Sequence, residues 1–191
     1  MDGMVRDELE GAGGATASGA SPYRGRRLRV SVVGAGTASP EEAEMAEALG
    51  RALGKAGAVV VTGGLGGVME AASRGCVKEG GLTVGILPGG EAGSANPWVR
   101  IPLATGMGEA RNALVVRAGE AVVAVGGGWG TLSEIALARK MGRAVALLGT
   151  PPGHLSLPRM VSPEAAAEWA LGQARAARCG ESHGEPGAGT S

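Results

Sequence analysis

The chain has 191 residues, equal numbers of basic and acidic residues (18 each), 37 glycines and no phenylalanine. This length suits one domain of about 150 residues with tails, and the balanced charge offers no field to attract nucleic acid or an anionic membrane surface. Two cysteines and two histidines, each isolated, form neither a disulfide framework nor a metal-ligand spacing. No apolar run reaches the roughly 18 residues of a membrane span. We therefore expect a cytoplasmic protein without a metal, a nucleic-acid partner or a membrane contact.

The N-terminal third of the chain contains a predicted tail, a strand and a helix. Residues 1–27 are rich in Gly and Ser and are expected to be a disordered tail. Near the end of this tail, Arg24, Arg26 and Arg27 either form a solvated charge cluster or reach a phosphate. A strand is predicted at 28–33, followed by a turn with Gly34, Gly36 and Thr37. Pro40 and two glutamates then open a helix that extends to about Lys55.

The middle third repeats the order of strand, glycine turn and helix. A strand at 58–62 runs into Gly63, Gly64, Gly66 and Gly67, and a helix follows over 68–79. Further strands are predicted at 82–87 and 99–103, and a helix with Arg111 at about 109–118.

The most informative stretch is Ala121–Leu137. It begins with five small apolar residues that do not alternate with polar ones, which is typical of a strand buried on both faces. Gly127, Gly128, Trp129 and Gly130 follow. Thr131 and Glu134 then have the spacing of a capping box at a helix start. Glu134 is interpreted either as this cap alone or as a functional carboxylate. A strand at 144–148, a helix at 163–178 and a second disordered tail at 179–191 complete the chain.

Alternating strands and helices predict an α/β fold. We expect one Rossmann-like (flavodoxin-like) domain at residues 28–178, with five or six parallel strands in a doubly wound sheet and helices on both faces. The glycine turns after Val33, Val61 and Val125 should then lie along one edge of the sheet. Ligands bind at that edge, where the strand order reverses.

Several nucleotide and hydrolase sites are disfavoured by the motifs. The turn at Gly34 lacks the third glycine of a dinucleotide site, where Ser39 stands, and no acidic residue ends the second strand. Neither a Walker motif nor G-x-S-x-G occurs. A phosphate cradle with few charges remains, and its expected ligand-binding residues are Gly34, Gly36, Thr37, Gly63, Gly64, Gly66, Gly67, Gly127, Gly128, Trp129, Gly130 and Thr131. Arg111 is either the cation that binds the phosphate or an ordinary surface residue.

Three segments carry a resemblance to a known superfamily. TGGLGGVME at 62–70, GMGEARN at 106–112 and GGWGTLSE at 127–134 resemble the LOG-like Rossmann proteins. That superfamily includes the cytokinin-activating phosphoribohydrolases, long mislabelled lysine decarboxylases, and the molybdenum cofactor carrier proteins. The second segment is more similar to the carrier branch, because the hydrolases usually have Met-His-x-Arg-Lys there.

The resemblance implies a homodimer or homotetramer, a phosphate bound at the glycine turns and no required cofactor. It also implies that a hydrolase would use Arg111 and Glu134 to cleave an N-glycosidic bond. We therefore expect binding of a small phosphorylated ligand, of the molybdenum cofactor carrier type. The candidates are an AMP-like nucleotide, phosphate or the molybdenum cofactor. The alternative is a nucleoside 5'-monophosphate phosphoribohydrolase.

Overall fold

The computed structural model describes residues 26–150 and 153–181. Most of the two predicted tails, at 1–25 and 182–191, lies outside the described residues, as do Pro151 and Pro152.

The described part of the chain alternates strands and helices. The strands are β1 (Arg29–Gly34), β2 (Val59–Thr62), β3 (Leu82–Leu87), β4 (Ile101–Ala104), β5 (Ala121–Val125), β6 (Ala144–Leu148) and β7 (Arg159–Met160). The α-helices are α1 (Pro40–Lys55), α2 (Val68–Lys78), α3 (Asn112–Ala118), α4 (Trp129–Lys140) and α5 (Pro163–Glu181). Two short 3₁₀ helices are η1 (Ala92–Ser94) and η2 (Gly108–Arg111).

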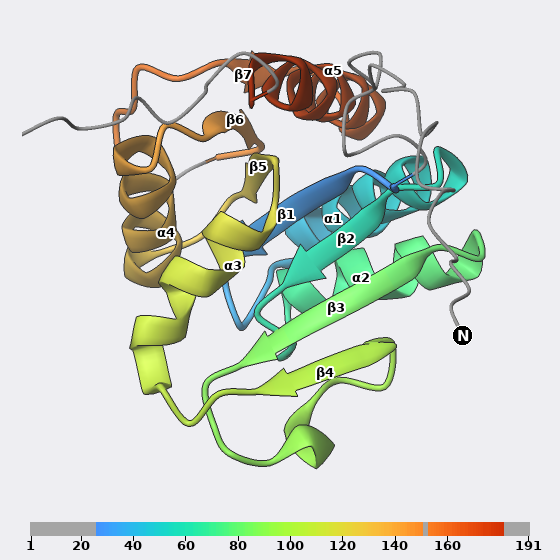
Figure 1. Ribbon diagram of the computed structural model, residues 1–191, viewed down its shortest axis with the longest axis vertical. Helices are drawn as coiled ribbons and strands as arrows, with labels where there is room; N and C mark the ends of the chain where they lie inside the picture. The colour runs from blue at the N-terminus through green and yellow to red at the C-terminus, as the bar shows by residue number, and fades with distance from the viewer. Residues whose placement is uncertain (1–25, 151–152, 182–191) are drawn as a thin grey trace, which may run out of the picture.

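The strands form one sheet in the order β4-β3-β2-β1-β5-β6-β7, and every neighbouring pair is parallel (Figure 1). Strands β2, β3 and β4 lie on one side of β1, and the later strands β5, β6 and β7 lie on its other side. The strand order therefore reverses between β1 and β5, and the carboxyl ends of β1, β2 and β5 meet at one edge. The predicted α/β fold with a parallel sheet is confirmed.

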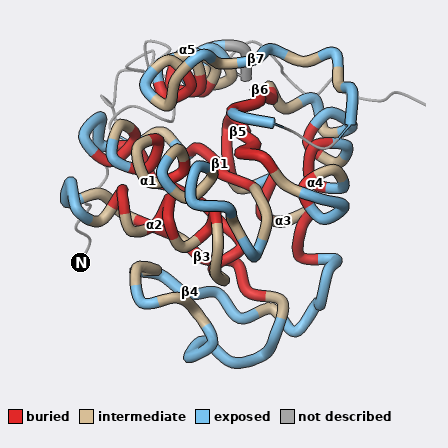
Figure 2. The backbone as a smooth tube through the Cα atoms, turned by 180° about the vertical axis from the view of Figure 1, so that it is seen from behind, coloured by how far each residue is buried: buried red, intermediate tan, exposed pale blue. Residues whose placement is uncertain are grey.

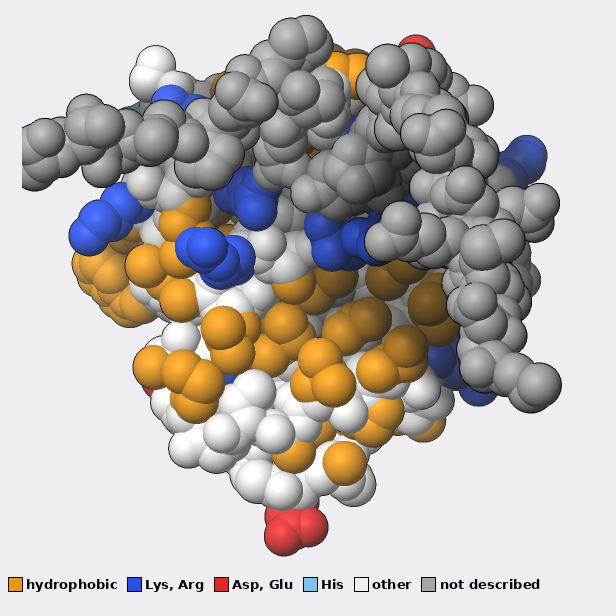
Figure 3. All heavy atoms as spheres, in the orientation of Figure 1, with side chains coloured by type: hydrophobic (Ala, Val, Ile, Leu, Met, Phe, Trp, Pro, Cys, Tyr) orange, Lys and Arg blue, Asp and Glu red, His pale blue; other side chains and the backbone are white. Residues whose placement is uncertain are grey.

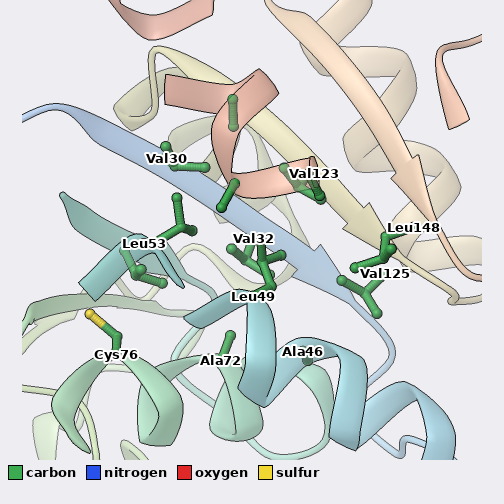
Figure 4. Packing of buried hydrophobic residues seen from close by; sticks show 14 of the residues in the cluster. Val30, Val32, Ala46, Leu49, Leu53, Ala72, Cys76, Val123, Val125 and Leu148 are labelled. Atoms are coloured by element: carbon green, nitrogen blue, oxygen red, sulfur yellow. The ribbon is translucent and has the colours of Figure 1, made fainter. Parts of the chain in front are cut away.

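Both faces of the sheet are covered, which explains why its central strands do not alternate with polar residues. Val30 and Val32 of β1 pack with Val123 and Val125 of β5 against α1, α2 and α5 (Figure 4). The residues between them point to the other face, where α3 and α4 lie. Because every position of β5 and the four central positions of β1 are buried, all of these residues except Ser31 are apolar.

The sheet edge at β4 is the least covered part of the described fold (Figure 2). All of β4 is exposed, including Ile101 at 41% and Leu103 at 46%. Hydrophobic side chains gather over β3, β4 and α3 on the face drawn in Figure 3. The connection between β3 and β4 contains no α-helix that could cover this edge; it contains only the short 3₁₀ helix η1.

Four details differ from the sequence-based predictions. α5 continues to Glu181, so that residues 179–181, predicted to begin the second disordered tail, are helical. β7 was not predicted, because Arg159 and Met160 form no apolar run. The helix expected at 109–118 begins as the 3₁₀ helix η2 and becomes α-helical only at Asn112. The predicted capping box at Thr131 is wrong: α4 begins at Trp129, Gly128 is its N-cap, and no side chain caps it.

A capping box does exist, but at α1. The Ser39 hydroxyl accepts a hydrogen bond from the Glu42 N–H at 3.2 Å, and the Ser39 N–H donates to the Glu42 carboxylate at 2.9 Å. The other Glu42 oxygen accepts from the Gly127 N–H at 3.3 Å. Glu42 therefore joins the start of α1 to the turn after β5, on either side of the point where the strand order reverses.

Candidate functional site

A cavity of about 330 Å³ lies at the carboxyl edge of the sheet, where β1 and β5 end. Five parts of the chain contribute to its wall: the turn after β1, the turn and start of α2, η2, the start of α3 and the first turns of α4. The lining residues are Gly34, Ala35, Gly36, Leu65, Met69, Glu109, Arg111, Asn112, Gly128, Gly130, Thr131 and Glu134. This is the place where doubly wound sheets bind ligands.

Arg111 is the buried cation of this cavity. It is only 5% exposed, so the reading of Arg111 as a surface residue is wrong. Its Nε and Nη1 atoms are buried and have no hydrogen-bond partner among the described residues. Burial lowers the pKa of Arg111, while the charges of Glu134 and Glu109 work in the opposite direction. The guanidinium nevertheless stays protonated, because arginine side chains are not deprotonated in proteins. The cavity thus holds a fixed positive charge with unused donors.

Gly63 makes room for that guanidinium. A Cβ atom built on Gly63 would collide with Arg111 Nη1 and would lie 2.7 Å from both Arg111 Cζ and Met69 Sδ. The glycine at the end of β2 therefore lets Arg111 lie against the backbone of the neighbouring turn.

The start of α4 provides the second group of unused donors. Leu132 makes the first intrahelical hydrogen bond, to Gly128 O at 2.9 Å. The N–H groups of Trp129, Gly130 and Thr131 precede that bond and have no acceptor within the helix. Thr131 Oγ1 is also buried without a partner among the described residues. Cβ atoms on Gly128 and Gly130 would meet nothing within 4 Å, so the backbone is open to a ligand here.

Glu134 faces the same cavity from the second turn of α4. It is 6% exposed, and its carboxyl makes no hydrogen bond within the described part of the chain. Burial raises the pKa of Glu134 to about 7; the charge of Arg111 opposes this rise and that of Glu109 adds to it. Glu134 does not cap α4, and a carboxyl with a pKa of about 7 can exchange a proton near neutral pH.

The predicted ligand-binding residues fall into two groups. Gly34, Gly36, Gly128, Gly130 and Thr131 line the cavity with Arg111 and Glu134. The other predicted residues do not line it: Thr37, Gly63, Gly64, Gly66, Gly67, Gly127 and Trp129.

Several of these other glycines hold the turns in shape. Gly67 has φ of 63°, and a Cβ there would collide with the turn at Ala35 and Gly36. Gly127 has φ of 108°, leaves space for the Thr131 side chain and donates its N–H to Glu42. Trp129 is not part of the cavity wall, and its side chain is 87% exposed to solvent.

Five residues that line the cavity were not assigned to the site by sequence reasoning: Ala35, Leu65, Met69, Glu109 and Asn112. Leu65 and Met69 form its apolar part. Asn112 Nδ2 donates to Ser133 Oγ at 3.3 Å and so joins α3 to α4. Glu109, Asn112, Leu65 and Met69 all lie within the segments that carry the superfamily resemblance, which was the available signal.

A second groove, of about 490 Å³, lies beside α1 and α2. Three of its four charged side chains are already paired: the Glu47 carboxylate accepts from Arg74 at 2.7 Å and from Arg51 at 2.8 Å, and also from Lys78 at 2.8 Å. The cavity at Arg111 differs because Arg111 Nε, Arg111 Nη1 and Thr131 Oγ1 are buried there without a partner among the described residues. That difference makes it the better candidate for ligand binding.

Two further searches concern metals and membranes. Within residues 26–150 and 153–181, no three His, Cys, Asp or Glu side chains gather in a way that could hold a metal ion. No described helix combines the length and the apolar character needed to cross a bilayer.

Comparison with known proteins finds similar proteins, among them three whose matches cover most of this chain. An uncharacterized protein of Archaeoglobus fulgidus is 44% identical over 124 residues, which are 65% of this chain and 82% of the relative. The molybdenum cofactor binding protein of Rippkaea orientalis is 36% identical with a TM-score of 0.71, and the match covers 77% of this chain and 97% of that one. The molybdenum cofactor carrier protein of Chlamydomonas reinhardtii is 33% identical with a TM-score of 0.70, covering 79% and 99%.

The profile of the SLOG cluster4 family matches residues 27–173, which include the whole cavity wall. Together with the parallel sheet and the similar carrier structures, this match establishes the LOG-like relationship. The chain belongs to the SLOG cluster4 family, within the LOG-like Rossmann superfamily and near its molybdenum cofactor carrier branch.

Proposed function

We propose that this protein binds a phosphorylated nucleotide-type ligand in the manner of a molybdenum cofactor carrier. The observation that carries the proposal is Arg111, whose buried Nε and Nη1 atoms have no partner among the described residues. Leaving a buried cation unpaired is costly. An anionic ligand removes that cost, because a guanidinium forms short, charge-assisted hydrogen bonds to phosphate.

Other groups of the cavity wall suit the phosphate and the ring of such a ligand. The start of α4, where backbone N–H groups lack an acceptor within the helix, lines the same cavity as Arg111, and helix N-termini favour phosphate. Leu65 and Met69 offer apolar contacts to a ring. The cavity volume of about 330 Å³ lies at the small end of typical ligand pockets. An AMP-like nucleotide or the molybdenum cofactor, carried as cargo, is therefore the expected ligand, and no permanent cofactor is needed.

The second candidate function is hydrolysis of a nucleoside 5'-monophosphate at its N-glycosidic bond. Glu134 favours it, because a buried carboxyl with a pKa of about 7 beside Arg111 has the properties of a general acid or base. The residues around the arginine favour the carrier: Glu109, Ala110 and Asn112 supply none of the positive charge that the hydrolases place there.

The experiment measures AMP binding by calorimetry and free adenine by chromatography on the same preparations. We expect Arg111→Ala to weaken AMP binding about 10- to 100-fold, since it removes charge-assisted hydrogen bonds. Arg117→Ala, which removes an exposed arginine of α3, is the matched control and should leave the affinity unchanged. We expect no adenine after overnight incubation of the native protein.

Two results would contradict this view. Equal AMP affinity in Arg111→Ala and in the native protein would remove the proposed phosphate site. Release of adenine in molar excess over protein, lost in Glu134→Gln while AMP binding persists, would establish the hydrolase instead.

A further inference from the structure

The cavity places a buried carboxyl where an anion has to bind. Arg111, the N-terminal turn of α4 and Glu134 all line the same space of about 330 Å³. The first two attract an anion, whereas an ionised Glu134 repels it. Because Glu134 is only 6% exposed, water screens this repulsion poorly.

No other charged group among the described residues of the cavity wall offsets that repulsion besides Arg111. Glu109 of η2 adds a second carboxylate, on the exposed rim. The turn after β1 and the start of α2 contribute only uncharged residues: Gly34, Ala35, Gly36, Leu65 and Met69. Glu42 lies behind the turn after β5, where Ser39 and Gly127 already donate to its carboxylate. One cation therefore faces two carboxylates before any ligand enters.

We propose that this cavity binds a doubly charged anion together with one proton, and that Glu134 holds that proton. The inference rests on the proposed phosphate site and adds the charge state in which the site is occupied. Protonation of Glu134 removes the repulsion and turns the carboxyl into a hydrogen-bond donor for an anion oxygen. The proton comes from solvent and leaves with the anion, so that no covalent bond changes.

The pH range follows from the carboxyl in the empty cavity. With a pKa of about 7, Glu134 is mostly protonated at pH 6 and mostly ionised at pH 8. Below pH 7 the anion finds the proton already in place, and its affinity is independent of pH. Above pH 7 each binding event has to take up a proton, so the dissociation constant rises about tenfold per pH unit.

Sulfate is the appropriate probe, because it stays a dianion throughout this range, whereas a phosphate monoester itself titrates near pH 6. Equilibrium dialysis with radiolabelled sulfate at constant ionic strength gives the dissociation constant from pH 6 to pH 8.5. We expect a flat region followed by the tenfold-per-unit rise in the native protein. Glu134→Gln should bind sulfate with little pH dependence, because the amide remains neutral throughout. Glu91→Gln, which changes an exposed carboxyl that does not line the cavity, should behave like the native protein.

Each other result has a defined meaning. Sulfate binding that depends on Arg111 but not on pH would overturn the proton linkage and leave the proposed function in place. The same holds if the pH dependence persists in Glu134→Gln and disappears in Glu109→Gln, since the proton would then reside on the rim. Absence of sulfate binding at pH 6, where the anion should bind most tightly, would overturn both proposals.

Discussion

Glu134 links the chemistry of the cavity to the stability of the fold. Its carboxyl is buried without a hydrogen bond among the described residues, so ionising it in the empty cavity costs free energy. Its pKa is raised from 4.5 to about 7, and the folded state therefore holds the proton more tightly than the unfolded chain. The stability that this provides is complete below pH 4.5 and is lost as pH rises through 7.

The residue-scale prediction is a fall in the free energy of unfolding between pH 5 and pH 8, by up to about 3 kcal/mol from this group alone. Urea denaturation without ligand measures it. In Glu134→Gln that component of the fall should be absent, because the amide does not titrate. Glu47 does not mask the effect: its pKa is lowered to about 2, mainly by Lys78, so its stabilisation is lost only in the range from 4.5 down to 2. Equal pH slopes in native protein and variant would contradict the buried, unpaired state of Glu134.

At the scale of elements, the turn between β2 and α2 determines where Arg111 lies. Gly63 directly follows β2, and the guanidinium occupies the space that a side chain at this position would fill. Gly63→Ala should displace Arg111 while leaving the backbone unchanged, since the obstructed atoms belong to two flexible side chains, those of Arg111 and Met69. We expect AMP binding to weaken by about tenfold, as after loss of a charge-assisted hydrogen bond.

Calorimetry with Gly90→Ala is the matched control for this element-scale prediction. A Cβ at Gly90 would meet nothing within 4 Å, and that substitution should leave the affinity unchanged. If Gly63→Ala binds AMP as tightly as the native protein, the position of Arg111 against this turn is not required for binding.

Most elements could be predicted because their signals are local. The apolar runs of β1 and β5 and the Pro-Glu-Glu start of α1 identified strands and a helix with little error. The start of α4 could not be predicted in the same way. Gly126 and Gly127 have positive φ and complete the turn early, so that the helix begins at Trp129 and Thr131 lies inside it.

The site was only partly predictable, because its contacts join segments far apart in the sequence. Arg111 reaches Gly63, and Glu42 reaches Gly127; neither pairing follows from a local pattern. The glycine motifs correctly indicated the edge of the sheet, but they did not distinguish the glycines that line the cavity from those that shape the turns. Leu65 and Met69 were missed for the same reason, since an apolar residue near a helix start reads as core.

At the scale of the whole molecule, Glu120 joins three elements at the edge opposite the cavity. It precedes β5 and accepts a hydrogen bond from the Arg29 N–H of β1 at 2.8 Å. Its other partner is Arg178 of α5, with Nε at 2.6 Å and Nη2 at 2.9 Å. Arg178 also donates to the carbonyls of Arg26 and Arg27. The start of the described chain and its last helix are thereby held to the centre of the sheet.

Association of copies is a separate prediction at this scale. The superfamily resemblance implies a homodimer or homotetramer, and exposed apolar side chains such as Ile101 and Leu103 are consistent with it. Light scattering should give at least twice the chain mass of 18.7 kDa. A single species of one chain at tens of micromolar protein would contradict it.

The charge network predicts how strongly α5 is held. Burial works to raise the pKa of Glu120, but the hydrogen bonds from Arg178 and Arg29 outweigh it and hold the pKa below its usual value. Glu120→Gln keeps the shape of the side chain but removes its charge, which weakens the hydrogen bonds that it accepts from Arg178 and Arg29. Because hydrogen bonds between charged groups are stronger than those between neutral groups, we expect a loss of about 1–3 kcal/mol, or roughly 2–12 °C in melting temperature. Glu91→Gln, at an exposed position, should change stability by less than about 0.5 kcal/mol.

AMP affinity should persist in Glu120→Gln below its melting temperature, since Glu120 does not line the cavity. An unchanged melting temperature would show that α5 is held by its apolar face alone.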